Sequence, residues 1–395
     1  MEYGSKQVIK MRKLLNFIVA IPVLLSSCQH GEILDLEITS IPLQRDSIDI
    51  YAAWTIYEDS NGIYFMAKKQ GESSVLLYKE TTDCFRFMQS FAFPQAYLDT
   101  MKDEIHSDKF QLIPVNLDSL IIYTRHTISL LDLKNGILLK HFAYNHDSEN
   151  VIIVDRAGPL KWNHERNVLP VMIVRFDKTG KKWEWDTEFA AEFSIESGEL
   201  NIIPVIYPKE KCYTNYILSG MHQEPFITYG KGQYVFGFEG SPTLLIYDPQ
   251  KNITDSIQII NPLYKPFPDY YDTLKLRGEV AYLQQMIRSA TFDYYHIQMA
   301  YDPYNNVYYR FFLQDLSEKN ENGKKNEYSD KKIGFSVIND RFQVIGDGHW
   351  EMKKANSSAW YPTSRGIYGF SHGCIGENCQ VKRLGNIIKI NWKKK

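Results

Sequence analysis

Short polar turns alternate with apolar and aromatic runs along most of the chain. In six places, a turn rich in Gly, Asn, Asp or Ser precedes a β-rich run that usually contains an early Tyr or another large residue. These runs begin at residues 63, 120, 168, 234, 307 and 367. Turn residues of these types supply the backbone angles of tight hairpins. The pattern therefore predicts six hairpins.

Further strand-like segments flank each predicted hairpin. The first strands of the hairpins are expected at 50–57, 110–114, 160–162, 226–229, 296–301 and 359–361. A second hairpin follows each time, over 74–91, 127–142, 189–206, 243–259, 333–346 and 379–391. Each unit then holds four antiparallel strands, and the repetition is the feature to interpret first.

Six such units predict an all-β fold, a six-bladed β-propeller of four-stranded antiparallel blades. A single twisted sheet cannot bury both faces, so neighbouring sheets stack around a channel. Short helical inserts are expected between blades, over Gln95–His106 and Glu279–Ala290. We expect an extra strand, Ile33–Ile41, to pair with the last unit and close the ring. A β-sandwich, or a pair of them, is the alternative that periodic hairpins leave open.

The amino-terminal segment has the order of a secretory signal. Met11-Arg12-Lys13 is basic, Leu14–Leu25 is apolar, and Leu25-Ser26-Ser27-Cys28 resembles the lipobox of bacterial lipoproteins. The apolar run is shorter than the roughly 20 residues that span a bilayer, although an uncleaved anchor is the alternative. We therefore expect a signal peptide over 1–27, a tether and ring-closing strand over 28–47, and the propeller over 48–395.

In that lipoprotein class, the cysteine corresponding to Cys28 carries the lipid that tethers the protein to the membrane. Gln29 follows Cys28, and in the same class a residue other than Asp at this position is a signal for the outer membrane. The resemblance thus implies a lipoprotein of the bacterial cell envelope, on the outer membrane.

Taken with the length and the Tyr-rich strands, the lipobox makes the chain similar to the uncharacterised lipoproteins of Bacteroides and relatives grouped as domain of unknown function 4221. The resemblance covers most of the mature chain. It implies a propeller-type fold and no agreed activity, so it supplies no functional residue.

The triplet Asp-Ser/Thr-apolar resembles the O-glycosylation site used on exported proteins in that bacterial group. Its five occurrences would place sugars on Ser47, Thr100, Ser119, Ser256 and Thr273. The alternative is that these triplets only end turns before strands, since both roles favour exposed loops.

Composition and charge narrow the function classes. The formal charge is −2, and 44% of residues are hydrophobic, which is ordinary for a globular protein and unlike the basic excess of nucleic-acid binders. Cys374 and Cys379 flank a turn and could form a disulfide in an oxidising compartment. A metal site with His372 lacks a fourth obvious ligand, so we predict no metal. Cys84 and Cys212 are expected to be buried.

Catalytic motifs give no support for an enzyme. Gly369-Phe370-Ser371-His372-Gly373 matches the nucleophile elbow of hydrolases, but the required acid and then histidine do not follow Ser371. Nucleotide-binding and zinc-protease motifs are missing from the sequence. We therefore assign no catalytic residue and no cofactor.

The remaining candidates are aromatic. Trp54, Trp162 and Trp360 fall on or near predicted first strands, which line a propeller channel, and Arg288, Tyr294 and His296 come from the longest connection. Aromatic faces stack on sugars and cations, and Arg binds carboxylates, although ordinary packing is the simpler role. The hypothesis is a non-enzymatic, lipid-anchored propeller that binds a glycan, peptide or partner protein on the face built by the long connections. The alternative is a glycan lyase or hydrolase with its active site at the channel.

Overall fold

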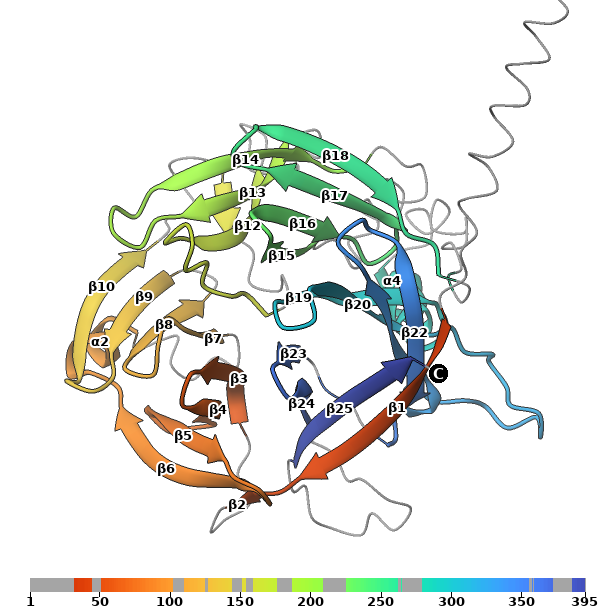
Figure 1. The fold of residues 1–395 in the computed structure, drawn as a ribbon, viewed down its shortest axis with the longest axis horizontal. Coiled ribbons are helices and arrows are strands. Elements are labelled where there is room, and N and C mark those ends of the chain that lie inside the picture. The colour runs from red at the N-terminus through yellow and green to blue at the C-terminus, as the bar shows by residue number, and fades with distance from the viewer. Residues whose placement is uncertain are drawn as a thin grey trace, which may run out of the picture.

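The computed structural model describes residues 32–44, 51–101, 110–124, 127–143, 151–153, 159–175, 187–208, 225–261, 264, 279–354, 357, 359–371 and 386–394. Their strands form sheets arranged around a common axis, and each sheet extends from strands near the centre to strands at the rim (Figure 1). The fold is mostly β with a β-propeller-like arrangement, as the hairpin repeat predicts.

Four of the sheets follow one another along the chain, and most run outward from the centre in chain order (Figure 1). The first contains β3 (Tyr51–Asp59), β4 (Gly62–Lys69), β5 (Ser74–Glu80), β6 (Phe85–Ala92) and the short β2 (Leu43–Gln44). The second contains β7 (Phe110–Pro114), β8 (Ser119–Thr124), β9 (Thr127–Asp132) and β10 (Ile137–Ala143). The third contains β11 (Val151–Ile153), β12 (Leu169–Arg175), β13 (Glu188–Phe193) and β14 (Leu200–Ile206). The fourth contains β15 (Phe226–Gly230), β16 (Gln233–Gly237), β17 (Thr243–Asp248) and β18 (Ile253–Gln258).

The fifth sheet has eight strands and joins the two ends of the chain. Its order is β19 (Tyr295–Asp302), β20 (Val307–Leu313), β21 (Lys332–Ile338), β22 (Val344–Glu351), β1 (Glu32–Ile41), β25 (Asn386–Lys394), β24 (Gly366–Ser371) and β23 (Trp360–Thr363). β1 is antiparallel to β25 from Leu34 opposite Lys394 to Ile41 opposite Ile387. The predicted pairing of the amino-terminal strand with the last unit is therefore confirmed.

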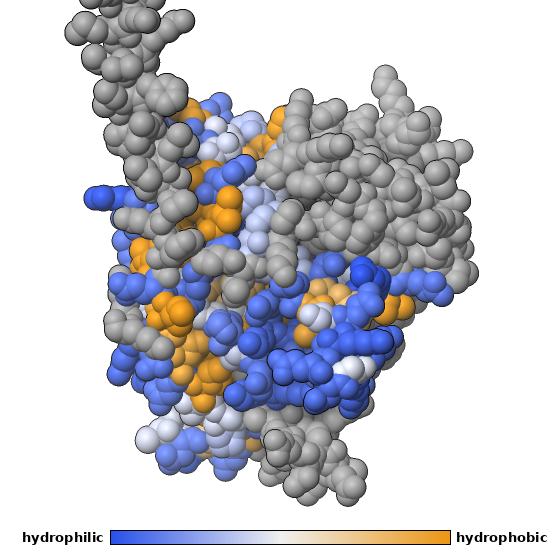
Figure 2. All heavy atoms as spheres, turned by 90° about the vertical axis from the view of Figure 1, so that its right-hand side faces the viewer, coloured by the Kyte–Doolittle hydropathy of each residue, from blue (hydrophilic) through white to orange (hydrophobic). Residues whose placement is uncertain are grey.

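Burial explains why the middle strands have continuous apolar sequences. Every residue of β20 is buried, because neighbouring sheets cover both of its faces. The outermost strand β18 is exposed at most positions and carries polar residues. Apolar side chains such as Phe87 and Met88 also remain exposed on the outer strand β6. Viewed from the side of β1 and β22, the surface shows hydrophobic patches among hydrophilic residues (Figure 2).

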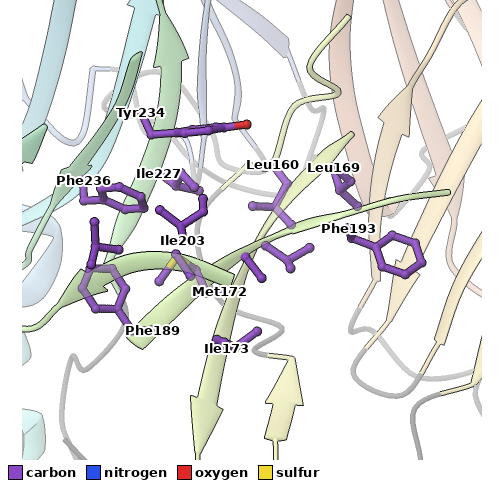
Figure 3. Close-up of a cluster of buried hydrophobic side chains, with 14 of the residues drawn as sticks. Leu160, Leu169, Met172, Ile173, Phe189, Phe193, Ile203, Ile227, Tyr234 and Phe236 are labelled. Carbon is purple, nitrogen blue, oxygen red and sulfur yellow. The ribbon is translucent and has the colours of Figure 1, made fainter. Parts of the chain in front are cut away.

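The core lies between the sheets. One cluster joins the second, third and fourth sheets. Figure 3 shows part of it, with Phe189 of the third sheet beside Phe236 of the fourth. Each fully buried side chain of this size contributes about 1.5–3 kcal/mol relative to exposure, so the sheets stabilise one another.

The third unit departs from its prediction. Residues 160–162 were expected to form its first strand, but they are irregular, with only a bridge from Asn163 to Val168. The first strand of this sheet is instead β11, which lies earlier in the chain. It pairs with the carboxyl-terminal half of β12, where Val151 lies opposite Arg175 and Ile153 lies opposite Ile173. Because residues 160–162 do not form a strand, their side chains do not have to alternate between the two faces of a sheet.

The helices of the described residues are α2 (Gln95–Thr100), α4 (Glu279–Phe292) and the 3-10 helix η2 (Tyr328–Asp330). α4 confirms the predicted helical insert before β19, and α2 begins where the other insert was expected. In the described parts of the chain, no helix is long and apolar enough to cross a membrane. The expected strand over 379–384 lies outside the described residues.

Candidate functional site

The three tryptophans singled out from the sequence have different environments. Trp360 is fully buried, and its ring stacks on Phe311 with centroids 5.8 Å apart while Trp350 packs edge-on at 5.4 Å. Trp54 is half-buried against Tyr361, at 5.5 Å between centroids. Only Trp162 of the three lines a described cavity. Packing therefore accounts for Trp54 and Trp360.

The residues from the long connection do not form a common binding surface with these tryptophans. Tyr294 and His296 are buried, and their side chains are hydrogen-bonded to each other at 3.2 Å. Burial, with the positive charge of Arg310, holds the pKa of His296 well below its usual value. Arg288 lies at the surface of α4 and pairs with Glu318 at 2.8 Å. Tyr294 and His296 thus belong to the core.

A cavity of about 230 Å³ opens where inner segments of three sheets meet. It is lined by residues 159–165 and 170 of the third unit, residues 227–229 of β15 and residues 298–301 of β19. β15 contributes its three central residues, and β19 contributes residues from the half of the strand that leads into the turn to β20. Since α4 precedes β19, the cavity lies at the other end of that strand. We predicted a binding face on the side of the long connections, and this cavity is not there.

Lys161 is the cation among the residues that line the cavity. Its ammonium lies 5.7 Å from the centre of the Tyr361 ring, on β23. Within the described residues, no hydrogen bond or ion pair to this ammonium is found. The side chain is accessible to solvent, but the surrounding protein removes part of its hydration. This desolvation lowers the pKa of Lys161 to about 8, against the opposing influence of Asp302 and Glu58.

The nearby carboxylates are already hydrogen-bonded. Asp302 is buried and accepts from the Tyr309 hydroxyl at 2.9 Å and from the backbone nitrogen of Tyr304 at 2.9 Å. Glu58 accepts from the backbone nitrogen of Ser364 at 2.9 Å and from its hydroxyl. These carboxylates act on Lys161 through their charge and do not bond to it directly.

Aromatic and amide groups form the walls. The ring of Tyr229 packs on Tyr234 at 4.9 Å, and burial together with its hydrogen bond to Glu165 raises the pKa of Tyr229 to about 12. Gln298 is fixed by two bonds to the backbone of Trp360, donating to its carbonyl at 2.5 Å and accepting from its nitrogen at 2.7 Å. The cavity therefore has rigid walls and one long, unbonded cationic side chain.

Sequence reasoning missed Lys161, Glu58 and Tyr229. One signal was available: Lys161 is a charged residue flanked by Leu160 and Trp162 in a segment predicted to be an inner strand. A charge in such a position needs a partner or a function.

The modification sites are only partly described. Thr100 and Ser256 are exposed and Ser119 is half-buried at the start of β8. Ser47, Thr273, Cys28, Cys212, Cys374 and Cys379 lie outside the described residues. Cys84 is a free thiol that is partly exposed, so its expected full burial is not found. No cluster of metal-ligating side chains occurs in the part of the chain that the structure describes.

Two solved structures with similar folds come from Bacteroides. A member of the DUF4221 family from Bacteroides vulgatus superposes with a TM-score of 0.66 at 14% identity, covering 93% of this chain and 100% of that one. A Bacteroides fragilis protein, named as a candidate exported protein, superposes with a TM-score of 0.52 at 10% identity, covering 92% and 98%. At these identities the likeness concerns the fold.

No curated protein matches the chain in sequence. The sequence model of a domain of unknown function, DUF4221, matches residues 170–346, which span the third, fourth and part of the fifth sheet. The resemblance drawn from the lipobox and the Tyr-rich strands is thereby confirmed, and the chain belongs to the DUF4221 family.

Proposed function

We propose that this protein is a non-catalytic binding protein and that its ligand is the end of a glycan, held in the cavity beside Lys161. The observation that carries the proposal is the convergence of aromatic walls and an unbonded ammonium in one cavity at the inner edges of three sheets. Ligand sites combine apolar walls with a few polar groups in this way. The volume of about 230 Å³ is small for a binding pocket and suits a single sugar ring.

Binding accounts for the cavity better than hydrolysis does. Glycoside hydrolases use two carboxyl groups, one as acid and one as base or nucleophile. Here Asp302 is engaged by the turn between β19 and β20, and Glu58 by Ser364. These two carboxylates support the turns, and Glu165, the carboxylate that lines the cavity, is hydrogen-bonded to Tyr229. The described residues therefore leave no unbonded pair of carboxylates at the cavity.

A glycan lyase is the second candidate, favoured by one observation. A lysine whose pKa lies near 8 could act as the base that removes a proton from a uronic acid. Incubation with polyuronates tests this: ultraviolet absorption by an unsaturated product would support a lyase, and its absence with intact binding would exclude one for those substrates.

We also propose that the ring has six blades. The eight-stranded sheet contains two four-stranded units, β19–β22 and β23–β25 with β1, joined where Glu32 and Ile33 run parallel to Gly346 and Asp347. With the other four sheets this makes six. An experimental structure that merges these units or adds another would contradict the count.

The lipobox supports a tether at Cys28 to the bacterial outer membrane. The name of the Bacteroides fragilis protein agrees with a location outside the cytoplasm. Mass spectrometry of the mature amino terminus tests the proposal, because an uncleaved leader with an unmodified thiol would contradict it.

The binding function is tested by titrating the protein with neutral and acidic methyl glycosides in a calorimeter. Tyr229→Ala removes a half-buried wall of the cavity and should weaken binding by about tenfold or more, since an aromatic contact contributes about 0.5–1.5 kcal/mol beyond its burial. Phe87→Ala removes an exposed aromatic ring on β6, far from the cavity, and should leave the affinity unchanged. Equal binding by both variants would contradict the assignment of the cavity, and no binding of any glycoside would contradict the glycan.

A further inference from the structure

The polar groups that line the cavity differ in whether their hydrogen bonds are already made. The amide of Asn163 donates to Tyr234 at 3.2 Å and accepts from the backbone of Glu165 and Arg166. Gln298 is committed to Trp360 at both ends of its amide. Neither amide is free to turn toward a ligand.

The other polar side chains of the lining are also engaged. The Thr228 hydroxyl accepts from the backbone nitrogen of Tyr301 at 3.1 Å, and the Tyr301 hydroxyl donates to Asn306 at 3.0 Å. Glu165 is hydrogen-bonded to Tyr229. Among the described residues, the lining groups whose polar side-chain atoms make no hydrogen bond are the ammonium of Lys161, the imidazole of His164 and the indole nitrogen of Trp162. Partial burial lowers the pKa of His164, so this imidazole is neutral at neutral pH.

We propose that the ligand carries a carboxylate, as a uronic acid residue does, and that Lys161 is the residue that binds it. This inference rests on the proposed glycan-binding function and adds the chemical class of the sugar. An ammonium has three donors and no acceptor, so its partner in the cavity must supply oxygen lone pairs. A charged acceptor gives bonds about twice as strong as a neutral one.

The surroundings of Lys161 favour an incoming anion over the carboxylates already present. Asp302 and Glu58 lie near enough to act on the ammonium electrostatically, but their oxygens are held by the backbone nitrogens of Tyr304 and Ser364. Rotating either carboxylate toward Lys161 would break those bonds. A free carboxylate entering the cavity has no such cost.

The state of the ammonium agrees with this geometry. Partial desolvation lowers the pKa of Lys161, which means that its charge is incompletely compensated in the empty cavity. The ring of Tyr361 faces the ammonium, and such a contact stabilises a cation only modestly. A carboxylate would supply the missing compensation, while Trp162 and Tyr229 would cover the sugar ring.

The experiment compares methyl glucuronide with methyl glucoside, which differ in the carboxylate at carbon six. The intact protein should bind the glucuronide about tenfold or more tightly than the glucoside, as a charged hydrogen bond requires. Lys161→Met keeps the length and apolar body of the side chain but removes the charge. This variant should bind both sugars alike, with the affinity for the glucoside within about threefold of the original.

Lys231→Met is the matched control. Lys231 lies in the turn between β15 and β16 and pairs with Asp340 at 2.9 Å, so its loss should keep the preference for the glucuronide. Equal affinities of the intact protein for the two sugars, or an unchanged preference in Lys161→Met, would overturn the inference and leave the proposed function standing. Binding of neither sugar would overturn both, and binding of N-acetyl-alanyl-alanine in their place would assign the carboxylate to a peptide.

Discussion

Arg310 of β20 illustrates how single residues join neighbouring sheets. Its side chain is buried, and its guanidinium donates to the carbonyls of Pro242 at 2.9 Å and Phe238 at 3.3 Å, with further bonds to Ser241 and Ile259. All four acceptors belong to connections of the fourth sheet. Loss of the guanidinium would remove all of these bonds, although the Pro242 carbonyl would still accept from the backbone nitrogen of Ile259. Each buried carbonyl left without a donor costs about 1–3 kcal/mol.

We therefore predict that Arg310→Met lowers the free energy of unfolding by at least about 3 kcal/mol, measured by urea denaturation. Arg310→Lys keeps the charge but lacks the planar guanidinium, so its free energy of unfolding should lie between those of the original protein and Arg310→Met. Arg341→Met, at an exposed position in the turn after β21, is the control and should change stability by less than about 0.5 kcal/mol. A similar small loss for Arg310→Met would show that the sheets do not depend on this contact.

At the scale of elements, the sequence predicted what is determined locally. Turn residues and apolar runs specify a hairpin without distant contacts, so the second strands of the repeat could be predicted. Their early tyrosines, such as Tyr234, Tyr308 and Tyr368, are buried. The first strand of the third unit, β11, could not be predicted, since it lies apart from its pairing partner β12 in the sequence. The cavity could not be predicted either, because Lys161 meets Tyr361 only when the ring is closed.

β1 is the element that joins the amino-terminal segment to the last strands. Leu36 of β1 turns inward and packs on the surrounding core, while Thr39 is exposed. β1 approaches β22 closely at two glycines: a Cβ at Gly346 would lie 2.4 Å from Leu34, and one at Gly348 would lie 2.9 Å from Leu36. The glycines thus leave room for the leucines, and the ring is closed by packing as well as by strand pairing.

Leu36→Asp places a charge on the buried side of β1 and should destabilise the protein by about 2–3 kcal/mol. It should also expose the amino-terminal segment to limited proteolysis, because β1 would detach from β25 before the rest unfolds. Thr39→Asp introduces the same charge on the exposed side of the strand and should behave like the original protein. If the two variants were cleaved at equal rates, β1 would not close the ring.

For the whole molecule, the ring creates the environment of Lys161. Its ammonium extends from the third unit toward Tyr361 on β23, with Glu58 of β3, Asp302 of β19 and its own neighbours His164 and Glu165 as the surrounding titratable groups. Only a closed ring places these groups together. Desolvation by the surrounding protein lowers the pKa of Lys161 to about 8, against the opposing charges of Asp302 and Glu58. The charge of the cavity therefore changes within a pH range in which glucuronide stays ionised and neutral His164 does not titrate.

We expect the affinity for methyl glucuronide to be constant below about pH 7 and to fall as the pH rises through about 8, because the carboxylate binds the protonated form of Lys161. The fall should approach tenfold per pH unit above the pKa of the free protein and end where the ammonium of the complex also loses its proton. Lys161→Arg remains charged throughout this range, so its affinity should not change with pH. Calorimetric titration from about pH 6.5 to 9.5 measures this dependence. If the affinity of the intact protein did not change with pH, or if the affinity of Lys161→Arg fell equally, another group would control binding.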